Sequence, residues 1–189
     1  MAVVVADVDA EELHAAVAVL LARLSATDDI AIATPVAGRG SRVLDPVVGM
    51  FVNTLVLRTS VDTGARFDDL LGRTKESDLE AFAHADLPFE RLVEVLNPAR
   101  STARHPVFQV GLSFQNIAHT ELALPGLAVA MHEVDTAVAQ FDLQLVVVDR
   151  YGPDGRPGGL DCTFSYATDL FDAATVQSFA DRLGRLFEA

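Results

Sequence analysis

The sequence predicts an α/β fold of the α+β kind, a mixed β-sheet with helices packed on one of its faces. Two patterns carry this prediction. Apolar residues recur every three or four positions in some segments, as in half-buried helices, and alternate with polar residues in others, as in strands. These segments do not follow a strict strand–helix–strand order, which favours a mixed sheet. With 189 residues, 50% of them apolar, the chain can bury a real core and fits one domain, or one domain and a fragment of another.

Helical spacing predicts four helices. Asp9 and Glu12 form a capping-box pattern at the start of the first. The periodic stripe of the second consists of Phe67, Leu70, Leu71, Thr74, Asp78, Leu79 and Phe82. The leucine–proline step at 87–88 ends the second helix, because the residue before a proline is pushed out of helical backbone angles. That proline suits the first position of a short third helix. The predicted helices span 10–24, 65–84, 88–96 and a final segment that Asp172 caps.

Alternation and short apolar runs bounded by glycine and proline predict the strands. In the clearest case, 107–115, apolar residues occupy one side while Gln, Gly and Ser occupy the other. The glycine-rich segment 152–159 is expected to turn the last two strands into a hairpin. The predicted strands span 30–36, 48–59, 107–115, 127–133, 141–149 and 160–167.

Composition excludes several classes of function. The chain has 14 basic and 27 acidic residues, a net charge of −13, whereas a nucleic-acid-binding surface needs clustered positive charge. The single cysteine, Cys162, rules out a disulfide framework and a cysteine-based zinc site, and is expected to be a buried strand residue. The longest early apolar run, 15–22, is too short to span a membrane. The first nine residues lack the basic start of a signal peptide, so we expect a cytoplasmic protein.

Motif spacing alone does not indicate an enzyme. Gly-x-Ser-x-Gly, a P-loop and metal-ligand spacing are all missing from the sequence. None of the five histidines is adjacent to another. His84 and His105 are not catalytic candidates, because nothing supplies a matching second group. The other three histidines are expected at the surface: His14, His119 and His132.

Three segments carry a resemblance to a known family. They read VGMFVNTLVLR at 48–58, HADLPFE at 84–90 and RSTARHPVFQV at 100–110. In this order they closely resemble the three downstream core motifs of nonribosomal peptide synthetase condensation domains. Flanking segments agree with this resemblance, and together the segments cover nearly the whole chain: TPVAGR at 34–39, QFDL at 140–143 and YATDLF at 166–171.

The resemblance implies half of a fold like that of chloramphenicol acetyltransferase, in which two lobes form a V. Carrier proteins dock on opposite sides and send phosphopantetheine arms into a tunnel between the lobes. The family's catalytic motif, His-His-x-x-x-Asp-Gly, belongs to the upstream lobe and is absent here. We therefore expect residues 1–189 to form the C-terminal lobe, inactive alone in amide bond formation. Two alternatives stay open: a stand-alone module that docks a carrier protein or another partner, and half of a related ester-forming acyltransferase.

The same resemblance predicts no catalytic residue and no metal site in this chain, only residues of the tunnel or of the lobe interface. Arg39 is the first candidate, and Arg58 the second, to pair with the aspartate of the upstream catalytic motif. A solvated arginine is the alternative for each. Asn53 either lines the tunnel near the reacting centre or fixes a neighbouring loop. The full set of candidates is Arg39, Asn53, Thr54, Arg58, Gln109, Ser113 and Gln115.

The polar side of the strand 107–115, with Gln109, Ser113 and Gln115, either faces solvent or lines the tunnel. Around the proline at 88, His84, Asp86 and Glu90 are expected to cap and pack. The expected partners are the missing N-terminal lobe and peptidyl or acyl carrier proteins, together with self-association, but neither nucleic acid nor a membrane. The chain itself should bind no cofactor, since 4′-phosphopantetheine would be carried by the partner proteins.

Overall fold

The computed structural model describes residues 2–5, 8–40, 42–44, 46–99, 101, 104–115, 127, 138–151 and 157–188. Within them the elements occur in the following order: β1 (Ala2–Val5), α1 (Ala10–Ser25), β2 (Asp29–Ala37), a 3-10 turn η1 (Arg42–Leu44), β3 (Val52–Ser60), α2 (Phe67–Ala83), α3 (Phe89–Leu96), β4 (Val110–Gln115), β5 (Leu143–Tyr151), β6 (Pro157–Tyr166) and α4 (Ala173–Phe187).

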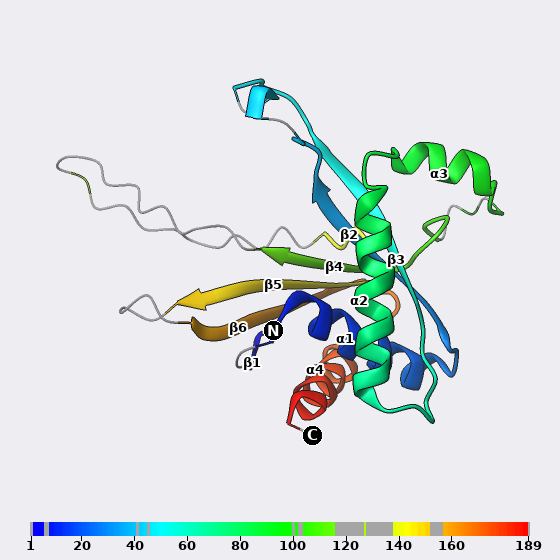
Figure 1. The fold of residues 1–189 in the computed structure, drawn as a ribbon. Coiled ribbons are helices and arrows are strands. Elements are labelled where there is room, and N and C mark those ends of the chain that lie inside the picture. Colours follow the sequence, from blue (N-terminus) through cyan, green and yellow to red (C-terminus); the bar gives the residue numbers. More distant parts are fainter. Residues whose placement is uncertain are drawn as a thin grey trace.

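The strands form one mixed sheet, which confirms the predicted fold class. Its order is β1-β6-β5-β4-β2-β3 (Figure 1). Strand β4 is parallel to both of its neighbours, β2 and β5. The pairs β2–β3 and β5–β6 are antiparallel, and β1 adds an antiparallel edge to β6. Strand β1 was not predicted, because a run of four residues is too short for a periodic signal.

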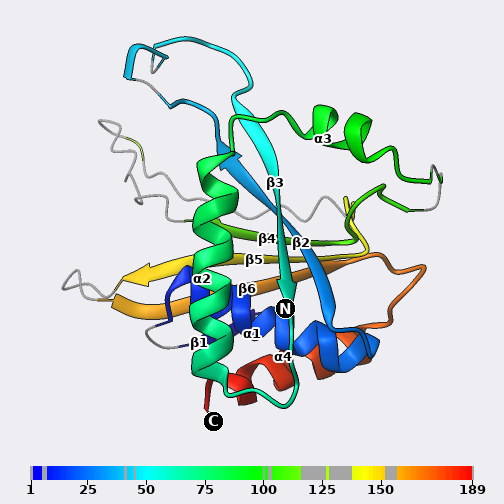
Figure 2. The same cartoon turned by 45° about the vertical axis from the view of Figure 1, so that its right-hand side comes forward.

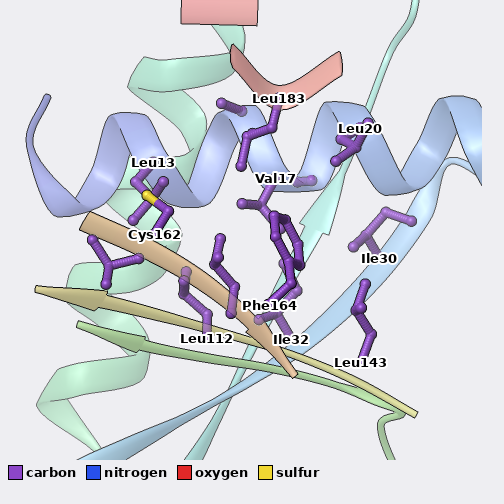
Figure 3. Packing of buried hydrophobic residues seen from close by; sticks show 14 of the residues in the cluster. Leu13, Val17, Leu20, Ile30, Ile32, Leu112, Leu143, Cys162, Phe164 and Leu183 are labelled. Atoms are coloured by element: carbon purple, nitrogen blue, oxygen red, sulfur yellow. The ribbon is translucent and has the colours of Figure 1, made fainter. Parts of the chain in front are cut away.

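Helices α1 and α4 lie on one face of the sheet, while α2 runs across α1 and also contacts β3 (Figure 2). The core lies between these layers. Leu13 and Val17 of α1 and Leu183 of α4 meet Ile32 and Phe164 of the sheet (Figure 3). All five side chains are at most 6% exposed. At about 25 cal/mol per Å² of apolar area, burial of this kind is the main stabilising term of the fold.

Helix boundaries follow the capping residues. Asp9 caps α1 with the reciprocal capping box that the sequence predicts, since the Glu12 amide donates to Asp9 and the Asp9 amide to the Glu12 carboxylate. Asp172 caps α4 by accepting from the Thr175 amide. The expectation for Pro88 was wrong by one position. Its backbone is extended, with ψ 138°, so it is the N-cap and α3 begins at Phe89.

Several predicted strand boundaries also differ from the structure. The strand expected over 48–59 begins only at Val52, because its partner β2 ends at Ala37, which pairs with Val52. The strand expected over 107–115 begins at Val110, the first residue paired with both neighbouring strands. Most of the predicted strand 127–133 and most of the turn 152–159 lie outside the described residues.

Candidate functional site

The β2–β3 hairpin projects beyond the rest of the sheet and ends in a loop, residues 38–51, that we call the arm tip (Figure 1). At its base the Gly38 amide donates to the Phe51 carbonyl at 2.5 Å. Above this bond the arm tip exposes large apolar side chains. Val48 is 98% and Met50 92% exposed, and Val43 is 79% exposed. A cluster of exposed apolar residues on one projecting loop is typical of an interaction surface.

Arg39 organises the arm tip from within. Its Nη1 donates to the Leu44 carbonyl at 2.6 Å and to the Val47 carbonyl at 2.9 Å. Its guanidinium also lies 4.4 Å from the centre of the Phe51 ring, a cation–π contact. Arg39 therefore ties η1 and the following turn to the base of the loop. Its predicted pairing with an aspartate of the other lobe stays a prediction.

Arg58 lies at the opposite end of the same hairpin and forms a two-pronged ion pair with Asp29. Its Nε donates to Oδ1 at 2.8 Å and its Nη2 to Oδ2 at 2.7 Å. Hydrogen bonding to the guanidinium lowers the pKa of the Asp29 carboxyl and raises the pKa of Arg58. Both side chains are more than half exposed, so the pair adds little stability. The two arginine candidates thus do not share a site.

Asn53 connects β3 to the turn between α2 and α3. Its Nδ2 donates to the carbonyls of Ala85 and Leu87 at 2.9 and 2.8 Å. Its Oδ1 accepts from the Phe89 amide at 3.1 Å. These bonds use both donors and the acceptor of the amide, which explains an asparagine in an apolar strand. The geometry favours the loop-fixing interpretation, while a contribution to the tunnel stays a prediction.

Replacing Asn53 by alanine should destabilise the fold by about 2–4 kcal/mol, since three hydrogen bonds are lost at about 0.5–1.5 kcal/mol each. Urea unfolding followed by circular dichroism measures the loss. Thr54→Ala is the matched control, because the half-buried Thr54 side chain makes no hydrogen bond to the described residues. Equal destabilisation by the two variants would contradict the role assigned to Asn53.

The polar side of β4 is not uniformly exposed. Gln115 is exposed and Gln109 is half-buried, with its Nε2 donating to the His105 carbonyl at 3.0 Å. Ser113, by contrast, is only 8% exposed, so of the two alternatives plain solvent exposure does not hold for this residue, and tunnel lining stays a prediction. The same face is closed at Gly111, where an added Cβ would lie 2.9 Å from the Phe141 ring. Neighbouring side chains therefore cover the middle of this face.

Four rings form an aromatic cluster between α3, the segment before β4 and the start of β5. Phe108 is its centre and is 2% exposed. The ring of Phe108 lies 3.9 Å from His105, 5.6 Å from Phe89 and 5.1 Å from Phe141, measured between ring centres. The His105 Nδ1 is buried and has no hydrogen-bond partner among the described residues. Burial lowers the pKa of His105, because the cluster disfavours an imidazolium ion.

This shift predicts a pH dependence of stability. The folded chain disfavours protonation of His105, so its pKa lies below the ordinary value near 6.5 that the unfolded chain has. Stability from this residue is therefore full above about pH 6.5 and is lost as the pH falls below it. His105→Phe should shrink the drop in the urea midpoint between about pH 7.5 and 5.5. An unchanged drop in that variant would contradict the assignment.

His14 was expected at the surface and is in fact 1% exposed. Its Nδ1 lies 2.8 Å from Oδ2 of Asp78 and its Nε2 lies 3.2 Å from Oγ1 of Thr59. The expectation failed because the partners come from α2 and β3, distant in sequence. The signal was the pair of polar residues in the helical stripe of α2. The geometry is that of a Thr–His–Asp triad, but Thr59 is 4% exposed and no substrate can reach it.

A mainly apolar groove of about 800 Å³ runs between the end of α1, α3 and the start of α4. Two predicted residues, Arg58 and Gln109, line this groove. Neither Arg39 nor Asn53 does, so the structure does not bring the candidates together into one site. The main apolar residues that line the groove are Leu21, Leu24, Leu92, Leu96, Phe171 and Phe179.

Other reactive groups are scarce in the described part of the chain. There, no three His, Cys, Asp or Glu side chains are placed to hold a metal ion. Cys162 is 0% exposed, as predicted, and burial raises the pKa of its thiol to about 11, so it is protonated and unreactive at neutral pH. None of the helices in these residues is both long and apolar enough to cross a bilayer.

Comparison with known proteins assigns the family. Residues 10–189 match the model of the condensation domain. The chain is 48% identical over 177 residues to a dimodular nonribosomal peptide synthase of Bacillus subtilis, covering 94% of this chain and 7% of that protein. It is 37% identical over 175 residues to an isonitrile lipopeptide synthase of Mycobacterium tuberculosis, covering 93% of this chain and 7% of that protein. The chain thus spans a small part of each synthetase.

Solved structures agree with this assignment. The X-domain from teicoplanin biosynthesis is 32% identical, with a TM-score of 0.85 over 94% of this chain and 40% of that chain. A second structure contains the X-domain in complex with OxyB. The match extends over almost all of the sheet and helices described above. The chain belongs to the condensation-domain family of nonribosomal peptide synthetases.

Proposed function

We propose that residues 1–189 form the C-terminal lobe of a condensation domain, which joins carrier-bound aminoacyl or peptidyl thioesters through an amide bond. The observation that carries this proposal is the coverage. Almost the whole chain aligns with the X-domain but accounts for only 40% of it. In a complete condensation domain, the part that this chain does not cover would be the upstream lobe, which we expect to carry the His-His-x-x-x-Asp-Gly motif. On this proposal the chain has no catalytic activity without the upstream lobe. The complete domain would work in the cytoplasm.

The chemistry explains the need for two lobes. The amine of one carrier-bound substrate attacks the thioester carbonyl of another, so that a C–N bond forms, the C–S bond breaks and the amine loses a proton. Holding both phosphopantetheine arms head to head contributes several kcal/mol through proximity. The oxyanion of the tetrahedral intermediate must also be stabilised, and the proton of the attacking amine must be removed. This lobe would supply the opposite tunnel wall, with the arm tip and Arg39 at the lobe contact and the cofactor on the carriers.

Association of separate lobes tests the proposal. The chain and an upstream lobe carrying the histidine motif are mixed and titrated by isothermal calorimetry. We expect specific binding that Val48→Asp/Met50→Asp weakens at least tenfold, because these side chains are 98% and 92% exposed at the arm tip. Leu170→Asp, at a 58% exposed residue before α4, is the control and should leave binding unchanged. No association, or equal weakening by the control, would contradict the proposal.

The same exposed surface favours self-association of the chain alone. Light scattering should then show a dimer or larger species at high concentration, and the Val48→Asp/Met50→Asp variant should be a monomer. A monomeric unmodified chain at all concentrations would contradict this expectation.

A second candidate function is a docking module without catalysis. The X-domain in complex with OxyB favours it, since that relative of 32% identity assembles with another protein. The test is a titration of the chain with a phosphopantetheinylated carrier domain. Binding in the absence of the upstream lobe would support this candidate, and its absence would reject it.

A further inference from the structure

Helix α2 packs on the rest of the protein through few buried side chains, which we call the seat of α2. Only three of its 17 residues are buried, namely Leu70, Thr74 and Asp78. Two of these three are polar, whereas an ordinary surface helix buries an apolar stripe. Two of its larger apolar side chains point elsewhere, since Leu79 is 60% and Phe82 50% exposed. Apolar burial therefore contributes little to the attachment of α2.

The polar part of this seat is incompletely paired. Asp78 Oδ2 bonds His14 of α1, and His14 in turn contacts Thr59 of β3. The other carboxylate oxygen, Asp78 Oδ1, and the Thr74 hydroxyl are buried and make no hydrogen bond to any described residue. Buried polar atoms without protein partners lose their water on docking and regain less in return. Separating α2 from the body would return these two atoms to solvent, and their rehydration would offset part of the loss of the His14–Asp78 hydrogen bond.

Helix α3 continues the same loosely held unit. It has no buried residue of its own. The turn before it is held by the three hydrogen bonds of Asn53, and its first residue, Phe89, inserts into the aromatic cluster. Strand β3 thus holds the α2–α3 segment at two points through polar groups, directly at Asn53 and through His14 at Thr59.

The position of α3 determines one wall of the groove. Leu92 and Leu96 of α3 face a second wall that Leu21 and Leu24 of α1 and Phe179 of α4 help to form. That second wall belongs to the layer of α1 and α4, which contributes most of the buried helical side chains. A displacement of α3 would therefore change the width of the groove while the second wall stays in place.

We propose that α2, the turn 84–88 and α3 form one movable unit that separates from α1 and β3 without global unfolding, and that this motion changes the width of the groove. Elements that move in function come from the least stable parts of a fold. The physical reason is the incomplete hydrogen bonding beneath α2. Asp78 Oδ2 bonds His14, but Asp78 Oδ1 and the Thr74 hydroxyl have no partner among the described residues. The arrangement assigns to α1, α4 and the sheet the role of a fixed base.

Native-state hydrogen exchange on the 189-residue chain tests this directly. The amides of α2 and α3 should exchange at least tenfold faster than those of α4, with a weaker dependence on low concentrations of urea. The proposal would be overturned if the amides of α2, α3 and α4 exchanged at the same rate and with the same dependence on urea concentration, as in one cooperative unfolding transition.

Two variants sharpen the test. Leu183→Ala removes a fully buried side chain of α4 from the fixed base, so α4 exchange should accelerate at least tenfold while α2 and α3 rates stay unchanged. Thr74→Val removes one unpaired hydroxyl at nearly constant volume and should slow exchange in α2 and α3 several-fold. Thr168→Val, at an exposed turn, is its control. Acceleration of all three helices by the same factor in Leu183→Ala would show a single unit and contradict the inference.

Discussion

Replacing Phe108 by alanine should destabilise the protein by about 3–5 kcal/mol, the range for removing a large buried aromatic side chain. Phe108 is 2% exposed and contacts the other three rings of the aromatic cluster. Its loss would leave a cavity between α3, β4 and the start of β5. Stacking with His105 and the edge contacts add to the loss of buried area.

Urea unfolding followed by circular dichroism provides the measurement for Phe108. Phe82→Ala is the matched control, since Phe82 lies on α2 and is 50% exposed. A half-exposed ring should change stability by much less than the buried one. The cluster would not have the central role assigned to it if the two variants differed by less than about 1 kcal/mol.

Gly38→Ala should weaken association with the upstream lobe at least tenfold. A Cβ at this position would overlap the Phe51 carbonyl oxygen, which is backbone and cannot turn away. The two strands must then separate at the base of the arm tip, where the Gly38 amide now bonds that same carbonyl. Such overpacking costs about 1–3 kcal/mol and displaces Phe51 from under Arg39.

Gly40 provides the matched control for this substitution. An alanine Cβ at Gly40 would have no atom within 4 Å, so Gly40→Ala makes the same chemical change two residues away without a clash. Calorimetric titration with the upstream lobe should give the unmodified affinity for Gly40→Ala. Equal affinities of the two variants for the upstream lobe would show that the shape of the arm tip does not affect lobe association, and would contradict this prediction.

The elements of this fold that depend on neighbours in sequence were predictable. The capping box at Asp9 and Glu12 acts over three residues, and the apolar–polar alternation in the sequence located β4, although both faces of the strand are covered in its middle. The motifs at 48–58, 84–90 and 100–110 placed the chain in its family for the same reason, since each is a local string of residues. The arm tip begins at Gly38, within the last two residues of the flanking segment 34–39, and includes the start of 48–58.

The polar contacts were harder to predict because their partners lie far along the chain. Asn53 reaches carbonyls 32 and 34 residues away, and His14 meets Asp78 at a separation of 64 residues. No periodic pattern specifies such a pair. The sequence still held a hint, because Thr74 and Asp78 interrupt the helical stripe of α2 where apolar residues are normal. A buried carboxylate needs a hydrogen-bond partner, so an aspartate in this stripe indicates a donor elsewhere in the chain.

Amide formation on mixing the two lobes is the most direct test of the central claim that this chain is one half of a condensation catalyst. The chain, an upstream lobe and two carriers loaded with aminoacyl groups are combined, and intact-mass spectrometry follows the dipeptidyl carrier. An acceptor carrying a hydroxyl in place of the amine distinguishes ester formation. Product is expected only when both lobes are present, none when the histidines of the upstream motif are replaced, and less with Gly38→Ala than with Gly40→Ala. Product from this chain alone, or none from the mixture while the intact domain is active, would contradict the claim.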